Sequence, residues 1–203
     1  MKRIYRYYGM CGTFKETTIK TLLKDPRRGY TLPVWSMNKP WKNLEKGVLN
    51  GLIRDSNIDL AALSLCNLEN VLRIADNDPD IEFLLCERGV LDNMFYQEIK
   101  YENLSKDQIK QIRQAELDIE SEHGFKEIRN TVLVMEDEDF IENCILLEPS
   151  RRKWFPDVES YLREQEKYVK FIFSYLNGEM VERRICSAAE YLKSIGVNYN
   201  LNH

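Results

Sequence analysis

The chain has 203 residues, of which 43% are hydrophobic and 31% are charged, and its formal net charge at pH 7 is −4. This length suits a single α/β domain with a substantial core, and the slight acidic excess argues against a broad nucleic-acid-binding surface. No apolar run approaches the roughly 20 residues that span a bilayer, and the N-terminus lacks the apolar core of a secretion signal.

The cysteine pattern indicates a reduced protein. The five cysteines are Cys11, Cys66, Cys86, Cys144 and Cys186. Their number is odd and no two form a CxxC pair, so neither a disulfide framework nor a zinc site is expected. The simplest prediction is a cytoplasmic protein.

Alternating strand and helix patterns predict an α/β fold formed by one domain, residues 1–203. Strands are predicted over residues 3–8, 29–35, 81–86, 131–135 and 181–186. Helices are predicted over 16–24, 58–76, 105–122 and 157–176, with a last helix that Ser187 caps and that ends at 195. Strand 81–86 is almost continuously apolar, as in a parallel strand buried on both faces. We therefore expect three layers: a five-stranded parallel sheet with helices on both faces.

The turn between the first strand and the first helix, residues 9–18, has the composition of a phosphate-binding loop. Ligands of parallel sheets bind at the carboxyl ends of strands, and small residues there let backbone N–H groups surround an anion. A lysine reaches the terminal phosphates, and a hydroxyl at the helix start holds magnesium. The candidate nucleotide-binding residues are Gly9, Cys11, Gly12, Thr13, Phe14, Lys15, Glu16, Thr17 and Thr18.

The loop departs from the pattern GxxxxGK[ST]. Gly9 and Lys15 match, but Phe14 stands at the second glycine and Glu16 at the hydroxyl position. Because side chains disfavour positive φ, we expect Phe14 to have φ below zero or the loop to be reshaped. In the alternative interpretation, the glycines only turn the chain and Lys15 is a solvated helix residue.

A second motif, Glu87-Arg88, follows the strand predicted at 81–86. A carboxylate at a strand end can hold magnesium through water, and the planar guanidinium suits multi-point recognition of a phosphate or hydroxyl. The alternative is an exposed ion pair of little energetic value.

Together, the two motifs resemble the deoxynucleoside kinase and thymidylate kinase group of P-loop kinases. The long helix at 58–76, the strand at 81–86 and Glu87-Arg88 follow the group's order, and 181–189 resembles its last strand and the turn near the donor base. The resemblance implies a P-loop NTPase fold that uses ATP and Mg²⁺ to phosphorylate a nucleoside or nucleoside monophosphate. It also implies a small helical lid at approximately 145–160.

The resemblance assigns roles to further residues. Lys15 binds the donor phosphates, Thr17 and Glu87 serve the metal, and Arg151 or Arg152 reaches the transferring group from the lid. Arg88 and Asp92 are assigned to the acceptor, and the aromatic side chains of Trp35 and Trp41, which flank residues 38–40, are candidates to stack on the acceptor base. Core packing of a tryptophan and a solvated basic turn at 151–153 remain alternatives.

Two departures keep other functions open. The group carries a catalytic carboxylate just before a Pro-Val pair, where this chain has Leu32. In the group an arginine often follows the aspartate that corresponds to Asp92, where this chain has Asn93. Glu87 or Asp92 would then supply the base. The second hypothesis is an inactive or divergent P-loop protein that binds a nucleotide or a protein partner. The third is a P-loop ATPase or a kinase of nucleic-acid ends. The oligomeric state stays open, a homodimer included.

Overall fold

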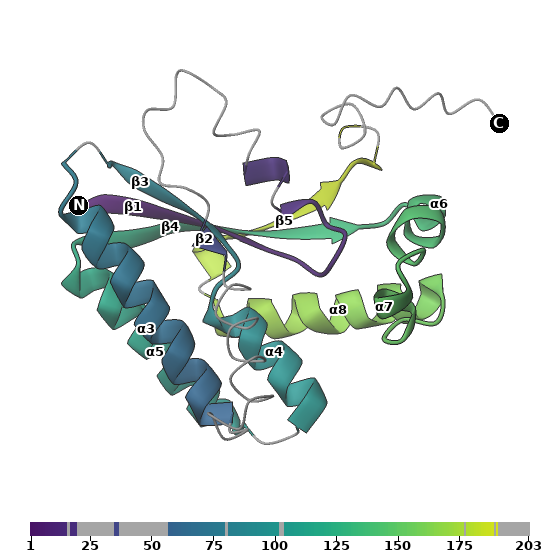
Figure 1. The fold of residues 1–203 in the computed structure, drawn as a ribbon, viewed down its shortest axis with the longest axis horizontal. Helices are drawn as coiled ribbons and strands as arrows, with labels where there is room; N and C mark the ends of the chain where they lie inside the picture. The colour runs from purple at the N-terminus through teal and green to yellow at the C-terminus, as the bar shows by residue number, and fades with distance from the viewer. Residues whose placement is uncertain are drawn as a thin grey trace.

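The computed structural model describes residues 1–15, 17–19, 35–36, 57–79, 81–101, 104–176, 178–188 and 190. The centre of this described part is a five-stranded parallel sheet in the order β2-β3-β1-β4-β5 (Figure 1). The strands are β1 (Lys2–Tyr8), β2 (Trp35–Ser36), β3 (Phe83–Glu87), β4 (Phe125–Met135) and β5 (Val181–Cys186). The parallel pairing confirms the predicted α/β class.

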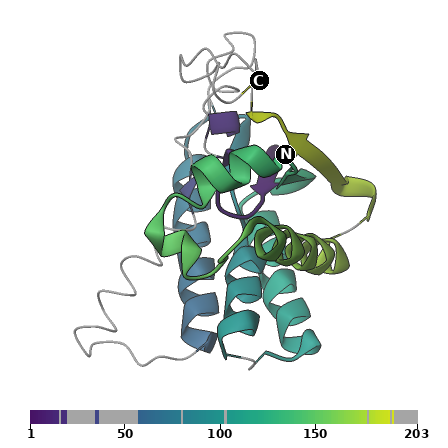
Figure 2. The ribbon, with the colours of Figure 1, turned by 90° about the vertical axis from the view of Figure 1, so that its right-hand side faces the viewer.

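Four long helices lie on one side of the sheet: α3 (Asn57–Asp76), α4 (Val90–Tyr101), α5 (Lys106–Glu122) and α8 (Val158–Tyr175). The helical residues 17–19 lie on the opposite side (Figures 1 and 2). At one end of the sheet, α6 (Glu138–Phe140), a π-helical turn (Ile141–Ile145) and α7 (Pro149–Arg152) form what we call the 138–152 segment. A 3-10 turn (Gly178–Met180) precedes β5.

Several boundaries agree with the sequence patterns to within one or two residues. Helices α3, α5 and α8 and strands β1, β3 and β5 lie where periodicity predicts them. Ser105 caps α5 in a reciprocal capping box with Gln108. Ser187 accepts a hydrogen bond from the backbone N–H of Glu190, as expected for the cap of the last helix.

Two elements differ from the prediction. Helix α4 is not among the predicted helices, which leave residues 90–101 unassigned. Strand β4 begins at Phe125 rather than at 131. A charged residue at a buried strand position, Glu127, hides this part of the strand from a hydrophobicity pattern, and its ion pair with Arg6 makes the burial tolerable. Residues 29–34 and most residues of the first and last predicted helices lie outside the described residues.

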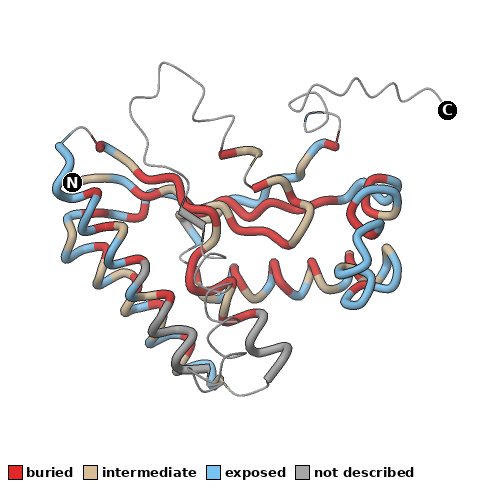
Figure 3. The backbone as a smooth tube through the Cα atoms, in the orientation of Figure 1, coloured by how far each residue is buried: buried red, intermediate tan, exposed pale blue. Residues whose placement is uncertain are grey.

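The buried residues form two apolar clusters that run through the strands and the inner sides of the helices (Figure 3). The larger one joins β4, α4, α8 and the 138–152 segment, and the smaller one joins α3 to β1 and β3. All five cysteines are free thiols in the structure. Among the described helices, none has the length and hydropathy of a membrane span.

Between the sheet and α5 lies a buried group of charges that we call the ionic cluster: Arg6, Arg113, Glu116, Glu120 and Glu127. Arg6, from the central strand β1, is fully buried and pairs with all three carboxylates. Arg113 binds Glu116 and, at 2.5 Å, Glu127. Each carboxylate therefore faces a guanidinium, which offsets the cost of removing these charges from water.

The ionic cluster contains two guanidinium groups and three carboxyl groups. Burial raises the pKa of Glu120 to about 7, against the opposing effect of Arg6, with Glu116 raising it further. Burial also opposes ionisation of Glu127, yet Arg6 and Arg113 hold its pKa below the ordinary value. A proton on Glu120 leaves a cluster whose charges balance.

We predict that Glu120→Gln stabilises the protein at pH 8 by about 1–3 kcal/mol and has a much smaller effect at pH 5.5. The raised pKa means that the folded chain keeps a proton that the unfolded chain has lost. The free energy of unfolding therefore falls as the pH rises from 4.5 toward 7. Urea unfolding at both pH values measures the effect. Glu122→Gln on the exposed side of α5 is the control, and equal effects of Glu120→Gln at both pH values would contradict the prediction.

Candidate functional site

The parallel pairing of β1 with β3 brings two loops to the same edge of the sheet. Tyr7 lies beside Glu87 in the register, so the loops that follow both strands start side by side. The backbone N–H of Arg88 donates to the carbonyl of Tyr7 at 2.9 Å and continues this pairing into the loop. Ser36, at the end of β2, also pairs with Glu87.

The loop of residues 9–15 folds tightly through backbone conformations with positive φ. Gly9 has φ 151° and Gly12 has φ 84°. A Cβ at Gly9 would lie 2.3 Å from Thr13 Oγ1, and one at Gly12 would lie 2.4 Å from Cδ1 of Ile145. Both backbone angle and space therefore require glycine at these two positions.

Phe14, at the position of the second glycine in the phosphate-loop pattern, has φ 55°. The expectation of φ below zero is therefore wrong, since the loop keeps a left-handed residue although the side chain is aromatic. The Phe14 ring packs edge-on against Phe140 of α6, with centroids 5.1 Å apart. Such a contact stabilises by about 0.5–1.5 kcal/mol, and a left-handed backbone at a residue with a side chain costs about 1–2 kcal/mol, so the two effects are comparable.

Lys15 is buried beneath this loop, with 5% of its surface exposed, and is not a solvated helix residue. Its ammonium donates to the carbonyls of Gly9 and Met10 at 2.6 and 2.7 Å. Burial lowers the pKa of Lys15 to about 7, and the charge of Arg88 lowers it further, against Asp92 and Glu87. The lysine thus lies inside the loop, in the electrostatic field of the second motif.

Two tyrosines of α8, two helical turns apart, form hydrogen bonds with the backbone of the 9–15 loop. Tyr161 donates its hydroxyl proton to the carbonyl of Cys11 at 2.7 Å. The Tyr168 hydroxyl accepts from the backbone N–H of Gly9 at 2.9 Å and donates to Asp92 Oδ1 at 2.6 Å. Neither role is predicted above, although the sequence contains a signal for it: a pair of tyrosines seven residues apart on the apolar face of α8.

Arg88 and Asp92 are joined across the first turn of α4. Arg88 has φ 72°, and its Nη1 lies 3.3 Å from Asp92 Oδ1 and its Nε 3.9 Å from Glu87 Oε1. About a tenth of the Glu87 and Arg88 side chains is exposed, so they are not a solvated pair. Burial raises the pKa of the fully buried Asp92, although Arg88, Lys15 and the Tyr168 hydrogen bond lower it.

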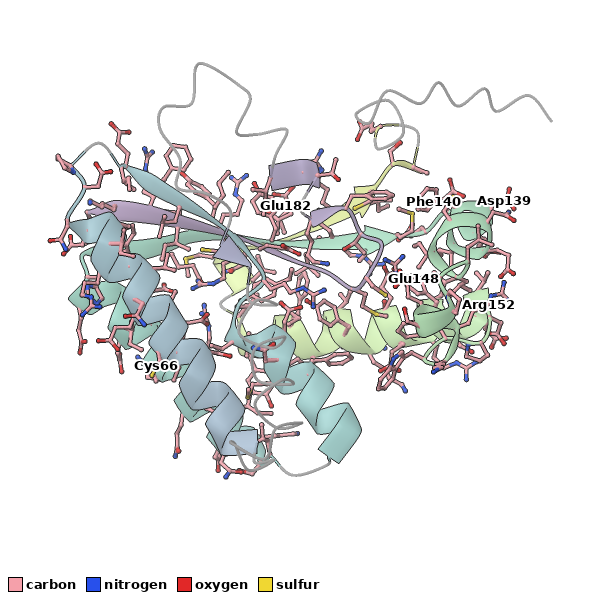
Figure 4. The ribbon with its side chains drawn as sticks, viewed as in Figure 1. Cys66, Asp139, Phe140, Glu148, Arg152 and Glu182 are labelled. Atoms are coloured by element: carbon pink, nitrogen blue, oxygen red, sulfur yellow. The ribbon has the colours of Figure 1, made fainter. Side chains whose placement is uncertain are left out.

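The two arginines of α7 lie differently. Arg151 pairs with Glu148 at 2.8 Å, and its charge, with those of Lys15 and Arg88, opposes the burial that raises the pKa of Cys11. Arg152 is half exposed, binds Glu142 at 2.7 Å and the carbonyl of Leu146, and lies on the outside of the 138–152 segment (Figure 4). The structure therefore brings Arg151, and not Arg152, toward the loop.

The remaining candidate residues are placed as follows. Thr13 is buried and donates to the carbonyl of Met10 at 2.9 Å. Thr17 and Thr18 are half-buried at the start of the first helix. Trp35 pairs with Cys86 at the site edge of the sheet, whereas Glu16 and Trp41 lie outside the described residues. No cluster of three histidine, cysteine, aspartate or glutamate side chains suited to a metal occurs in the described ranges.

No protein-family model matches the chain, and no curated protein sequence matches it. Solved structures do match over nearly the whole chain. The thymidylate kinase from Candida albicans is 14% identical, with a TM-score of 0.52, and the match covers 100% of this chain and 96% of that one. The deoxyadenosine kinase from M. mycoides with bound dATP is 14% identical, with a TM-score of 0.51 and 97% coverage of both chains.

The thymidylate kinase from Ehrlichia chaffeensis gives a similar result: 11% identity, a TM-score of 0.51, and coverage of 91% of this chain and 87% of that one. At such low identity the likeness concerns the fold alone. The chain has the fold of the P-loop nucleoside and nucleotide kinases, which is the resemblance that its two motifs indicate.

We predict that Phe14→Gly is more stable than Phe14→Ala by about 1 kcal/mol. Both variants lose the contact with Phe140, but only alanine retains the cost of a side chain at φ 55°. Urea unfolding of the two variants gives the difference directly. An alanine variant as stable as the glycine variant would show that position 14 has lost its left-handed backbone.

Proposed function

We propose that the chain is a nucleoside or nucleoside-monophosphate kinase that transfers the γ-phosphate of ATP to a (deoxy)nucleoside or (deoxy)nucleotide. One observation carries the proposal: Lys15 of the 9–15 loop, Arg88 of the second motif and Asp92 of α4 form one buried electrostatic group at the edge of the sheet. A loop that turns at glycines and carries a lysine suits the binding of donor phosphates, and an arginine beside that lysine suits the binding of an acceptor.

The transfer needs alignment and charge neutralisation more than covalent chemistry. Lys15 would move its ammonium from the loop carbonyls to the donor phosphates, and the 9–15 backbone would bind the same phosphates. Arg88 would hold the acceptor hydroxyl or phosphate, with Asp92 as the acceptor-binding carboxylate and candidate base. Trp35 and Trp41 remain candidates to stack on the acceptor base.

The 145–160 region would serve as a lid within a single domain. Of its two candidate arginines, Arg151 suits the transferring phosphate better, because its charge acts on Cys11 of the loop whereas Arg152 binds Glu142 on the outside. A cytoplasmic location fits the five free thiols.

The residues present suit a magnesium ion held jointly with phosphates. Mg²⁺ in nucleotide-dependent enzymes takes few protein ligands and completes its shell with water and phosphate oxygens. Thr17 offers a hydroxyl at the helix start, and Glu87 offers a carboxylate at the end of β3. When bound, the ion would neutralise charge on the phosphates.

One observation favours a second function, a divergent P-loop protein that binds a nucleotide without transferring phosphate. The Lys15 ammonium already donates to two carbonyls of its own loop, and Phe14 stands at the second glycine position of the phosphate-loop pattern. A ligand must displace these contacts. Calorimetry with ATP and Mg²⁺, followed by a transfer assay on a panel of nucleosides and nucleotides, separates the two functions, since binding without transfer supports the second.

We predict that Lys15→Ala weakens ATP binding by about 10- to 100-fold, because a charge-assisted hydrogen bond to phosphate is worth about 1.5–3 kcal/mol. Phosphate transfer should fall at least as much. Calorimetry and a coupled transfer assay measure both quantities. Lys126→Ala, on an exposed position of β4, is the control; if both variants bind ATP like the original chain, the 9–15 loop is not the donor site.

We also predict that ATP binding takes up a proton above pH 7 and that affinity falls as the pH rises from 7 to 9. The free protein holds Lys15 with a pKa of about 7, and an anionic ligand favours the charged ammonium, so the bound state has the higher pKa. Calorimetry in two buffers of different ionisation enthalpy measures the uptake. The uptake should vanish in Lys15→Ala, and its persistence there would assign the proton to another group.

A further inference from the structure

The ionic cluster lies directly beneath the turn that carries Glu87 and Arg88. A Cβ built on Gly89 would lie 2.6 Å from Tyr8 Oη and 3.1 Å from both Arg6 Nε and Glu116 Oε1. Glycine at this position is therefore required by space, since any side chain would push the turn away from the sheet. The position of the turn is set by the surface of the buried cluster.

Glu116 makes the direct bond between cluster and turn. Its Oε1 accepts from the backbone N–H of Val90, the first residue of α4, at 3.2 Å, and lies 3.2 Å from Arg6 Nη2. Its Oε2 accepts from Arg113. A carboxylate at a helix start satisfies an otherwise unpaired N–H and complements the helix dipole. Helix α4 is thus held at its first residue by a side chain 26 positions away.

Holding Val90 also holds the residues on either side of it. Arg88 precedes Val90 by two positions and is fixed on its other side by the bond from its N–H to Tyr7. Asp92 follows by two positions and bonds to Tyr168 and Arg88. A shift of the α4 start would therefore move Arg88 and Asp92 together relative to the 9–15 loop.

We infer that Glu116 is a positioning residue, which sets Arg88 and Asp92 relative to the donor loop through its bond to Val90. Its neighbour Glu120 pairs with Arg6, and Glu127 pairs with Arg6 and Arg113, whereas the N–H of Val90 donates to Glu116. The inference rests on the proposed function for its catalytic readout, so a second readout that needs no catalysis accompanies the test.

The first test compares Glu116→Gln with Glu120→Gln. Both oxygens of Glu116 accept hydrogen bonds, so a glutamine must turn its NH₂ toward a donor. We expect a loss of at least about tenfold in kcat/KM for the acceptor, because small misplacements of binding groups are costly, with the KM for ATP changed less than about threefold. Glu120→Gln should stay within about threefold in both. Equal losses in the two variants, or none in Glu116→Gln, overturn the inference.

Gly89→Ala displaces the same turn by adding a Cβ against the ionic cluster, and it tests the positioning role if Glu116→Gln does not fold. Its acceptor-specific loss should be partly recovered in Gly89→Ala/Tyr8→Phe, which removes the hydroxyl that the new Cβ meets. The described residues provide no hydrogen-bond partner for that hydroxyl, so Tyr8→Phe alone should be neutral. A folded Gly89→Ala protein with unchanged acceptor parameters overturns the inference.

Amide hydrogen exchange separates this inference from the proposed function. In Glu116→Gln the amides of Val90 and Arg88 should exchange at least about tenfold faster than in the original chain and in Glu120→Gln. If the original chain transfers no phosphate to any acceptor, the proposed function fails, and the exchange rates still decide the role of Glu116. Unchanged exchange at Val90 overturns it.

Discussion

The parallel pairing of β1 with β3 is the constraint on which the site depends. It sets Tyr7 beside Glu87, so that the 9–15 loop and the Glu87–Val90 turn leave the sheet at one edge. Parallel strands place their carboxyl ends together, and this geometry lets residues 80 positions apart share one electrostatic environment. Helix α8 then ties the two loops to each other, because a single hydroxyl of Tyr168 bonds to Gly9 and to Asp92.

Two buried groups of charges adjoin the turn of residues 87–90. On the loop side, Lys15 and Asp92 are removed from water, and burial shifts their pKa values toward the neutral forms. In the other group, the carboxyl groups of the ionic cluster pair with Arg6 and Arg113, and Glu116 also bonds to the turn. Buried charges of this kind add little net stability but fix geometry, which is what the proposed phosphate transfer would require.

The 9–15 loop is held by contacts among its own residues and with the 138–152 segment. Lys15 binds carbonyls of its own loop, and the left-handed Phe14 is held by Phe140 from the 138–152 segment. Under the proposed function, a donor phosphate that binds Lys15 must replace these two hydrogen bonds and favour the charged ammonium that burial disfavours, so part of its binding energy is spent on rearranging the loop. The contact between Phe14 and Phe140 also couples the loop to the segment that carries Arg151.

The sequence by itself determined the α/β class, the boundaries of α3, α5, α8 and β5, and the position of the glycine-containing turn after β1, because periodicity, caps and turn residues are local properties of the chain. It did not reveal helix α4, the early start of β4 at Phe125, the positive φ of Phe14 or the outward position of Arg152. Those features depend on partners far away in the chain, such as Arg6 for Glu127 and Phe140 for Phe14. Only the tertiary structure decided them, since the cost of burying a charge or straining a backbone depends on what is packed against it.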